Sequence, residues 1–193
     1  RNTSVCKMAK AVGAEIFPVD IGVNTDRIFP GVISRKVKKG TNDFLLKPAM
    51  SEREAMQAVR VGMELVKECK EAGYTLLGTG EMGIGNTTTS AAMAAALLSV
   101  PPEIVAGRGA GLSDEGLVRK RQVISEALEK YQLRETEPMR ILCSVGGLDI
   151  AGLCGVFLGG AKYHMPIVAD GVISAVAALT AERLCPGTKE FII

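Results

Sequence analysis

The chain has 193 residues, a length that favours one domain with a substantial core over two small domains. Hydrophobic residues make up 47% and charged residues 23%, close to an ordinary globular protein, so a largely disordered chain is excluded. The 23 basic residues nearly balance the 21 acidic ones, which argues against a nucleic-acid binder with a clustered basic face.

The first third of the chain predicts a short helix, a strand and a long connection. Asn2 or Thr3 can cap a helix that runs to about Val12. Residues 14–20 are expected to form a strand. Residues 21–50 contain several prolines and glycines and are expected to form a long irregular connection, which in a compact domain usually has a function.

A capping box marks the start of the next helix. The Ser51 side chain can accept from an amide of the first turn, and Glu54 can reach back to the serine amide. This helix should end near Gly73. A strand at 74–79, a glycine-rich turn and a helix of small residues at about 87–98 follow.

The remaining elements again alternate. A glycine-rich turn at 107–111 precedes a helix that Ser113 caps and that runs to about Tyr131. The later predictions are, in order, a strand at 140–145, a helix from about 148 to 163, a strand at 166–169, a helix at 172–184 and the start of a strand at 191–193.

This alternation predicts a single α/β domain over residues 1–193. Strand–helix–strand order implies right-handed crossovers and a mainly parallel sheet with helices on both faces. The expected architecture is therefore a three-layer, doubly wound, Rossmann-like fold. Ligands in such folds bind beyond the carboxyl ends of the strands, so the glycine-rich turns should share one edge of the sheet.

The segment 80–90 has the features of a phosphate cradle. Its three glycines let the backbone approach a ligand closely, and the helix that follows begins with unpaired amides. A purely structural turn would explain the glycines but not the acidic Glu81 inside the loop. The residues expected to contact substrate here are Met82, Gly83, Gly85, Asn86, Thr87 and Thr88.

A P-loop is the nearest alternative motif. The segment Gly80–Thr87 has the P-loop spacing G-x-x-x-x-G-x-T, but Asn86 stands where the P-loop lysine would be. Without that lysine a monophosphate ester is the more natural ligand. A P-loop-like nucleotide-binding or hydrolysing domain stays an alternative, as does a flavodoxin-like binding module without chemistry.

Four blocks in order resemble one enzyme family. The loop Glu81–Thr88 is similar to the signature of the nicotinate-nucleotide:dimethylbenzimidazole phosphoribosyltransferases, and the likeness extends over essentially the whole chain. The other blocks are Gly107-Arg108-Gly109-Ala110-Gly111 with Gly116-Leu117-Val118-Arg119-Lys120, Val145-Gly146-Gly147-Leu148-Asp149-Ile150-Ala151-Gly152, and Val168-Ala169-Asp170-Gly171-Val172-Ile173-Ser174.

The resemblance implies transfer of the phosphoribosyl group of nicotinate mononucleotide to dimethylbenzimidazole, in cobalamin biosynthesis. The products are α-ribazole 5′-phosphate and nicotinate. Nicotinate leaves as a stable pyridine and no pyrophosphate departs, so neither a metal nor a cofactor is expected. The benzimidazole proton requires a carboxylate base, and in the family this is a glutamate of the C-terminal part, outside this chain.

The resemblance also assigns individual residues. Glu81 matches an active-site glutamate that orients or stabilises the reacting groups, and Lys120 matches a phosphate-contacting lysine. Gly109 and Ala110 are expected to supply backbone contacts. Asp170 is a candidate ribose ligand, although helix capping explains it nearly as well. Because Asp114 and Glu115 would repel an anion at their own helix, the phosphate is expected on the turn 83–88, with Lys120 reaching across.

Other features set the expected context. The chain opens on Arg1 and ends on an apolar segment, so we expect a central piece of a longer enzyme that binds nucleotide weakly and is inactive alone. Five scattered cysteines and the single His164 offer no zinc site and fit free thiols in the cytoplasm. Two small-molecule substrates and a second copy in a homodimer are the expected partners, with no nucleic acid and no membrane.

Overall fold

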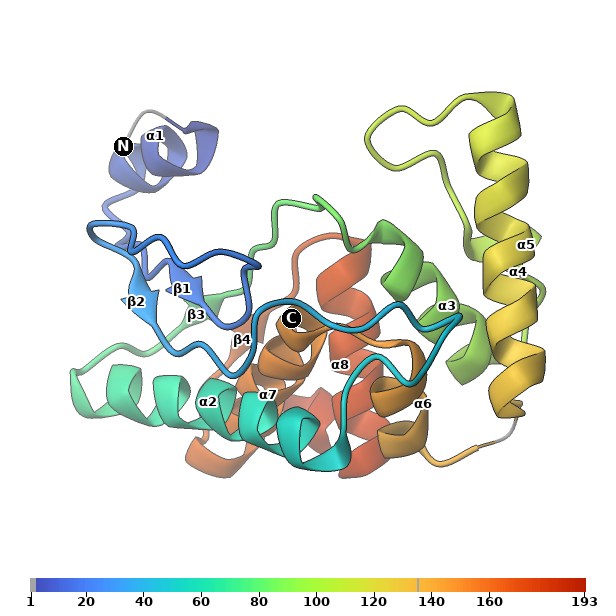
Figure 1. Cartoon of the computed structure of the whole chain (residues 1–193). Coiled ribbons are helices and arrows are strands. Elements are labelled where there is room, and N and C mark those ends of the chain that lie inside the picture. The colour runs from blue at the N-terminus through green and yellow to red at the C-terminus, as the bar shows by residue number, and fades with distance from the viewer. Residues whose placement is uncertain (1–2, 135) are drawn as a thin grey trace.

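The computed structural model describes residues 3–134 and 136–193 and shows a helix-rich α/β fold (Figure 1). In the described part of the chain, no helix has the length and apolar character to cross a membrane. The elements are α1 (Ser4–Ala11), β1 (Val19–Asp20), β2 (Ile33–Ser34), α2 (Glu52–Glu71), β3 (Leu77–Gly78), α3 (Thr87–Leu98), α4 (Pro102–Val105), α5 (Asp114–Tyr131), α6 (Pro138–Val145), α7 (Leu148–Tyr163), β4 (Ile167–Val168), α8 (Val172–Leu184) and the 3₁₀ helix η1 (Thr188–Phe191).

The helix starts that local signals predicted are confirmed. The Thr3 hydroxyl accepts from the Cys6 amide at the start of α1, whereas Asn2 lies outside the described residues. Ser51 and Glu54 form the complete capping box of α2. Ser113 accepts from the amide of Gly116 at 3.1 Å and caps α5. Side chains close in sequence satisfy these amides, so capping residues predict helix starts without knowledge of the tertiary structure.

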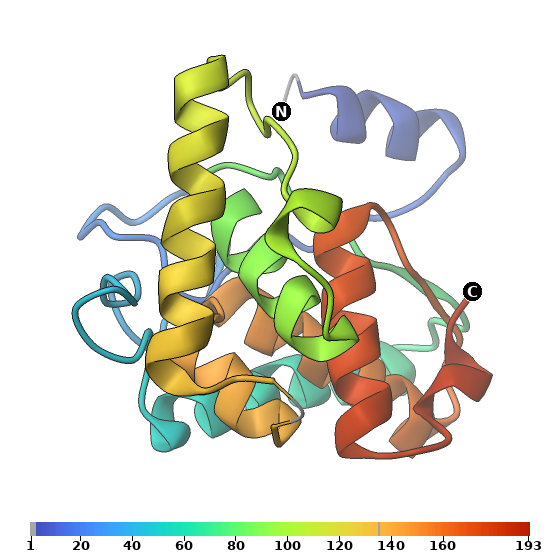
Figure 2. The ribbon, with the colours of Figure 1, turned by 90° about the vertical axis from the view of Figure 1, so that its right-hand side faces the viewer.

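The strands pair in parallel, as the alternation predicted, but they are very short. β1 pairs with β2, and β3 pairs with β4 with Leu77 opposite Ile167. The α/β class is therefore confirmed. The three-layer, doubly wound sheet is not confirmed. In the described part of the chain the strands form two separate two-stranded sheets, β1 with β2 and β3 with β4. Helices pack mainly on one another, and Figure 2 shows α3, α4, α5 and α8 side by side.

The strand predicted at 140–145 is wrong, because this segment is the helix α6. Pro138 occupies its first turn, where its fixed φ favours a helix start. The buried residues Ile141, Leu142 and Val145 lie on one helical face, a pattern that six residues are too few to separate from a buried strand. The amides of residues 49–50 donate to the last carbonyls of α6 and complete its C-terminal end.

The strand expected to begin at 191–193 is also not formed as predicted. Phe191 ends the 3₁₀ helix η1, and only Ile192 makes a parallel bridge, to Ile167 of β4. The Glu182 carboxylate accepts hydrogen bonds from the amides of Gly187 and Lys189, which holds the preceding turn in a helical form. A side chain from α8 therefore decides the local conformation here.

The centre of the core is the close packing of α2 on α7, which lie against each other in Figure 1. A Cβ atom added at Gly155 would lie 1.9 Å from the carbonyl oxygen of Val59. One added at Gly62 would lie 2.0 Å from the carbonyl oxygen of Gly152. The two backbones approach so closely that only glycine fits at these positions.

We predict that Gly155→Ala destabilises the protein by about 2–3 kcal/mol, because the new methyl group must force the two helices apart. Urea unfolding measures the change. Gly78→Ala is the matched control, since a Cβ there meets nothing within 4 Å, and its effect should stay within about 0.5 kcal/mol. Equal stabilities for the two variants would contradict close helix packing as the reason for Gly155.

Candidate nucleotide site

The loops that follow β3 and β4 emerge side by side. The two strands are parallel neighbours in register, so their carboxyl ends meet at one edge. The Thr79 hydroxyl links the two loops: it donates to the carbonyl of Val168 at 3.0 Å and accepts from the amide of Asp170 at 3.3 Å. The sequence blocks around 80–88 and 168–174 are thus brought together, as the sequence predicted.

The loop 80–86 folds back on itself. Gly83 and Gly85 have φ values of 77° and 79°, which a residue with a side chain adopts only with strain. The Glu81 carboxylate accepts a hydrogen bond from the Gly83 amide, so it stays over its own loop. Met82 is 77% exposed and points into solvent. The loop therefore presents backbone and one carboxylate close to the start of α3.

The first turn of α3 has free donors. In the described part of the chain, no group accepts a hydrogen bond from the backbone N–H of Thr87, Thr88 or Thr89. Asn86 precedes the helix but its side chain makes no capping bond. Its amide donates instead to the carboxylate of Asp149 at 2.6 Å. The positive end of the helix dipole and three amides are available to an anion.

Lys120 of α5 reaches this helix start. Its ammonium donates to the hydroxyl of Thr87 and to the carbonyl of Gly107, both at 3.0 Å. The residue is only 6% exposed. Burial lowers the pKa of Lys120 because desolvation penalises the charged form. No carboxylate pairs with it in the described part of the chain, so the ammonium has one donor left for a ligand.

The glycine-rich turn 107–111 lies against the same point. A Cβ atom at Gly109 would lie 2.7 Å from the Thr87 hydroxyl, so this glycine lets the turn approach α3. Ala110 is exposed at the tip of the turn, which leaves its backbone accessible to a ligand. Arg108 holds the outer part of the turn by donating to the carbonyl of Leu112 and to Asp114.

Asp170 lies just past the carboxyl end of β4, where the sequence placed it. It is exposed, and its carboxylate accepts from the adjacent Gly171 amide at 2.7 Å. The helix that follows, α8, begins near the loop 80–86, because Ile173 is the neighbour that a Cβ at Gly83 would meet. Glu81 and Asp170 therefore lie on the two neighbouring loops that follow β3 and β4.

Asp149 is the polar residue that sequence reasoning did not select. It lies in the first turn of α7, and its contact joins segments 63 residues apart. It belongs to the third resembling block, so its position was visible, but no local pattern pairs it with Asn86. A carboxylate two residues after a glycine pair is a weak signal without the fold.

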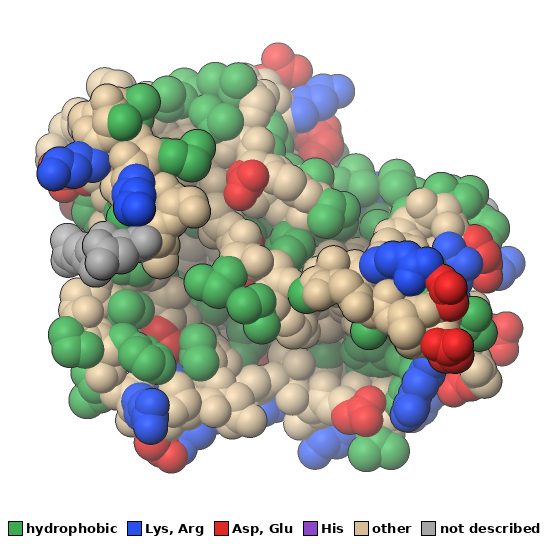
Figure 3. Space-filling view, turned by 90° about the horizontal axis from the view of Figure 1, so that it is seen from above, with side chains coloured by type: hydrophobic (Ala, Val, Ile, Leu, Met, Phe, Trp, Pro, Cys, Tyr) green, Lys and Arg blue, Asp and Glu red, His purple; other side chains and the backbone are tan. Residues whose placement is uncertain are grey.

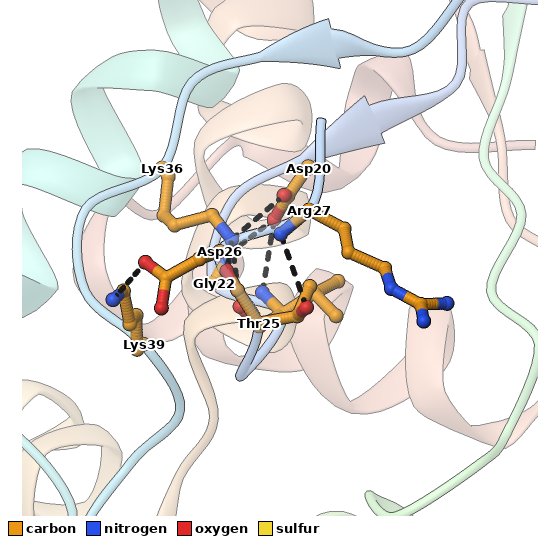
Figure 4. A network of polar contacts seen from close by, with 8 residues as sticks. Asp20, Gly22, Thr25, Asp26, Arg27, Lys36 and Lys39 are labelled. Atoms are coloured by element: carbon orange, nitrogen blue, oxygen red, sulfur yellow. Dashed lines mark hydrogen bonds and ion pairs between the residues drawn. The ribbon is translucent and has the colours of Figure 1, made fainter. Parts of the chain in front are cut away.

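A second polar cluster holds the segment that carries β1 and β2 (Figure 4). The Lys36 ammonium pairs with Asp20 at 3.0 Å and donates to the carbonyls of Val23 and Thr25. Burial raises the pKa of Asp20, but hydrogen bonds from Val23 and Lys36 outweigh it, so the net shift is downward. The neighbouring cavity of about 160 Å³ is lined by none of the predicted site residues.

The likeness to known proteins extends along the whole chain. A family model described as a phosphoribosyltransferase matches residues 1–193. The chain belongs to this family. Similar curated relatives are nicotinate-nucleotide–dimethylbenzimidazole phosphoribosyltransferases, so the resemblance stated from four sequence blocks is confirmed.

Three of these similar proteins illustrate the extent of the match. The enzyme of Alkaliphilus metalliredigens is 48% identical, over 99% of this chain and 55% of its own length. That of Clostridium perfringens ATCC 13124 is 45% identical, over 98% of this chain and 52% of its own length. The crystal structure of CobT from Thermus thermophilus has a TM-score of 0.92 at 37% identity, over 99% of this chain and 57% of its own. The chain spans about half the length of the curated relatives it matches.

We predict that Lys120→Met flattens the alkaline part of the stability profile. In the folded chain Lys120 loses its proton at a lower pH than in the unfolded chain, so its burial opposes folding while both forms are protonated. This cost is relieved progressively as the pH rises from the lowered pKa of the folded chain to the higher pKa of the unfolded chain. The wild-type free energy of unfolding should therefore gain from rising pH more than that of the variant. Urea titrations at several alkaline pH values measure the difference, and identical profiles would contradict it.

Proposed function

We propose that the protein transfers the phosphoribosyl group of nicotinate mononucleotide to dimethylbenzimidazole, releasing nicotinate and α-ribazole 5′-phosphate. The family and the names of the relatives support this reaction. The supporting geometry is the meeting of the loops that follow the paired strands β3 and β4. Residues 1–193 form the nucleotide-binding domain in this proposal.

The observation that carries the proposal is Lys120 at the uncapped start of α3. The 5′-phosphate accepts from the amides of Thr87–Thr89 and from the remaining donor of the Lys120 ammonium. A buried ammonium without a carboxylate partner is costly, and a bound phosphate removes that cost. Gly83, Gly85, Gly109 and Ala110 let the backbone approach the phosphate and ribose.

The remaining predicted residues take roles around the ribose. Glu81 holds a carboxylate near the anomeric carbon, where positive charge develops as nicotinate leaves. Met82 projects from the same loop and covers the base. Asp170, exposed beside Thr79, accepts from a ribose hydroxyl. Asn86, expected from the sequence to contact the substrate, instead shapes the loop in this proposal, because its side chain is held by Asp149.

A P-loop-like nucleotide hydrolase fits less well. Asn86 occupies the place of the P-loop lysine, and its side chain is held by Asp149 at 2.6 Å instead of facing a ligand. Lys120 arrives from another helix and reaches only the first residue of α3. This lysine supplies positive charge for one phosphate group. A triphosphate chain would lack positive charge for its other phosphate groups.

A homodimer in the cytoplasm completes the proposal. Helix α1 buries none of its residues, and Val5, Met8 and Val12 are all more than half exposed. Figure 3 shows the face of the molecule seen from above. Hydrophobic side chains are spread over this face, and most charged side chains lie toward its margins. A second copy covering such a surface would remove it from water. All five cysteines are free thiols, which fits a reducing compartment.

We predict that Lys120→Ala weakens nicotinate mononucleotide binding by about 10–100-fold, the loss expected for a charge-assisted hydrogen bond of about 1.5–3 kcal/mol. Isothermal calorimetry measures it. Lys67→Ala on α2 is the control, because Lys67 is exposed and pairs with Glu71 of its own helix. ATP with magnesium should give no binding. Tight ATP binding, or equal affinity in the two variants, would overturn the proposal.

We predict that Glu81→Gln lowers kcat for α-ribazole 5′-phosphate formation by about 100-fold, because it removes charge where the transition state needs it. The glutamine oxygen still accepts from the Gly83 amide, so the loop keeps its shape. The KM for nicotinate mononucleotide should change little. Steady-state kinetics of the full-length protein test this, because residues 1–193 are expected to be inactive alone, and an unchanged kcat would assign Glu81 a structural role only.

A further inference from the structure

Asn86 and Asp149 make a buried contact that the proposed reaction does not yet use. Asn86 is 5% exposed, and its Nδ2 donates to Oδ2 of Asp149 at 2.6 Å. Because a carboxylate only accepts, this contact fixes which way the amide group points. Oδ1 of Asn86 is left buried with no partner in the described part of the chain. The side chain is thus held in place at the cost of an unsatisfied acceptor.

The other end of Asn86 is fixed as firmly. Its carbonyl accepts from the hydroxyl of Thr89 at 2.7 Å, and from the hydroxyl and amide of Ser90, both at 2.9 Å. The peptide plane that holds this carbonyl also holds the Thr87 amide, which must point the opposite way. The Thr87 N–H is therefore directed away from the body of α3, toward the loop.

The conformation of Asn86 is unusual for the residue before a helix. Capping residues have extended backbone, and their side chain bonds an amide of the first turn. Asn86 has φ −122° and ψ −2° and makes no such bond. Asparagine is among the best capping residues, so its failure to cap requires a cause. The bond to Asp149 supplies one, because it directs the side chain away from α3.

Asp149 is itself placed by the glycine pair before α7. A Cβ atom at Gly147 would lie 2.3 Å from Oδ1 of Asp149, so a larger residue would displace the carboxylate. The position of Asp149 in the first turn of α7 also lets that helix dipole stabilise its charge. Because the α7 dipole stabilises its charge, the Asp149 carboxylate can lie close to an anion site without an ion pair to Lys120.

We propose that Asp149 is a positioning residue: by holding the Asn86 side chain, it keeps the start of α3 uncapped and open for the substrate phosphate. This rests on the proposed function, in which that phosphate binds the first turn of α3. When the restraint is removed, Asn86 turns back and its side-chain oxygen occupies the amides that the phosphate needs. Asp149 acts through Asn86 and does not touch the ligand.

The test compares Asp149→Ala with Asp149→Asn by calorimetry against nicotinate mononucleotide and phosphate-free nicotinate riboside. The alanine variant should bind the mononucleotide about tenfold more weakly and the riboside as well as wild type. The asparagine variant still accepts from Asn86 and should keep wild-type mononucleotide affinity, or exceed it, since a negative charge is gone. Glu52→Ala, which removes an acid from the first turn of α2, should change neither affinity.

Two outcomes would overturn the positioning role. One is an asparagine variant as weak as the alanine variant, which would mean that the charge itself contacts the ligand. The other is equal loss of mononucleotide and riboside binding in the alanine variant, which would mean general damage to the site. A third outcome separates the two proposals. If the wild-type and Asp149→Asn proteins bind inorganic phosphate more tightly than Asp149→Ala does, but none of them binds the mononucleotide, the proposed reaction is wrong and the positioning role is supported.

Discussion

The close approach of α2 and α7 is the constraint on which the rest of the structure depends. Helix α2 leads into β3 and α7 leads into β4, so packing these helices together brings the two strands into parallel register. Glycines at 62 and 155 remove the side chains that would keep the backbones apart. The loops that carry Glu81 and Asp170 meet only because the helices before them do. A two-residue strand pair is too short to impose this arrangement by itself.

Local signals in the sequence predicted the parts of the fold that local interactions decide. The capping residues Thr3, Ser51 and Ser113 satisfy amides within three positions, and the helices they start were predicted correctly. Residues 140–145 failed because β-branched and leucine residues in a six-residue run fit a buried strand as well as a buried helix. Only the packing of the surrounding helices selects the helix over the strand. The single predicted sheet is not formed because β1 pairs with β2, from a segment expected to be irregular, and 140–145 is a helix instead of a strand that would join the pairs.

For the candidate site, the sequence indicated the loops but not how they interact. The glycine blocks, Glu81 and Lys120 were visible as patterns, and the structure places Lys120 on Thr87 across 33 residues. The bond between Asn86 and Asp149 spans 63 residues and depends on where two helices begin, which no sequence spacing records. Resemblance to the family identified both blocks and left their contact unseen.

The start of α3 concentrates groups that do not stabilise the fold. An uncapped helix start, a buried lysine without a carboxylate partner in the described chain and an orphaned amide oxygen each oppose folding. All lie within one loop and its neighbours, while α2, α7 and the core around them are closely packed. A protein that concentrates such costs in one place can retain them because rigid surroundings hold the groups apart. An anion with several acceptor oxygens would satisfy the amides and the ammonium together, which no residue of the described chain does.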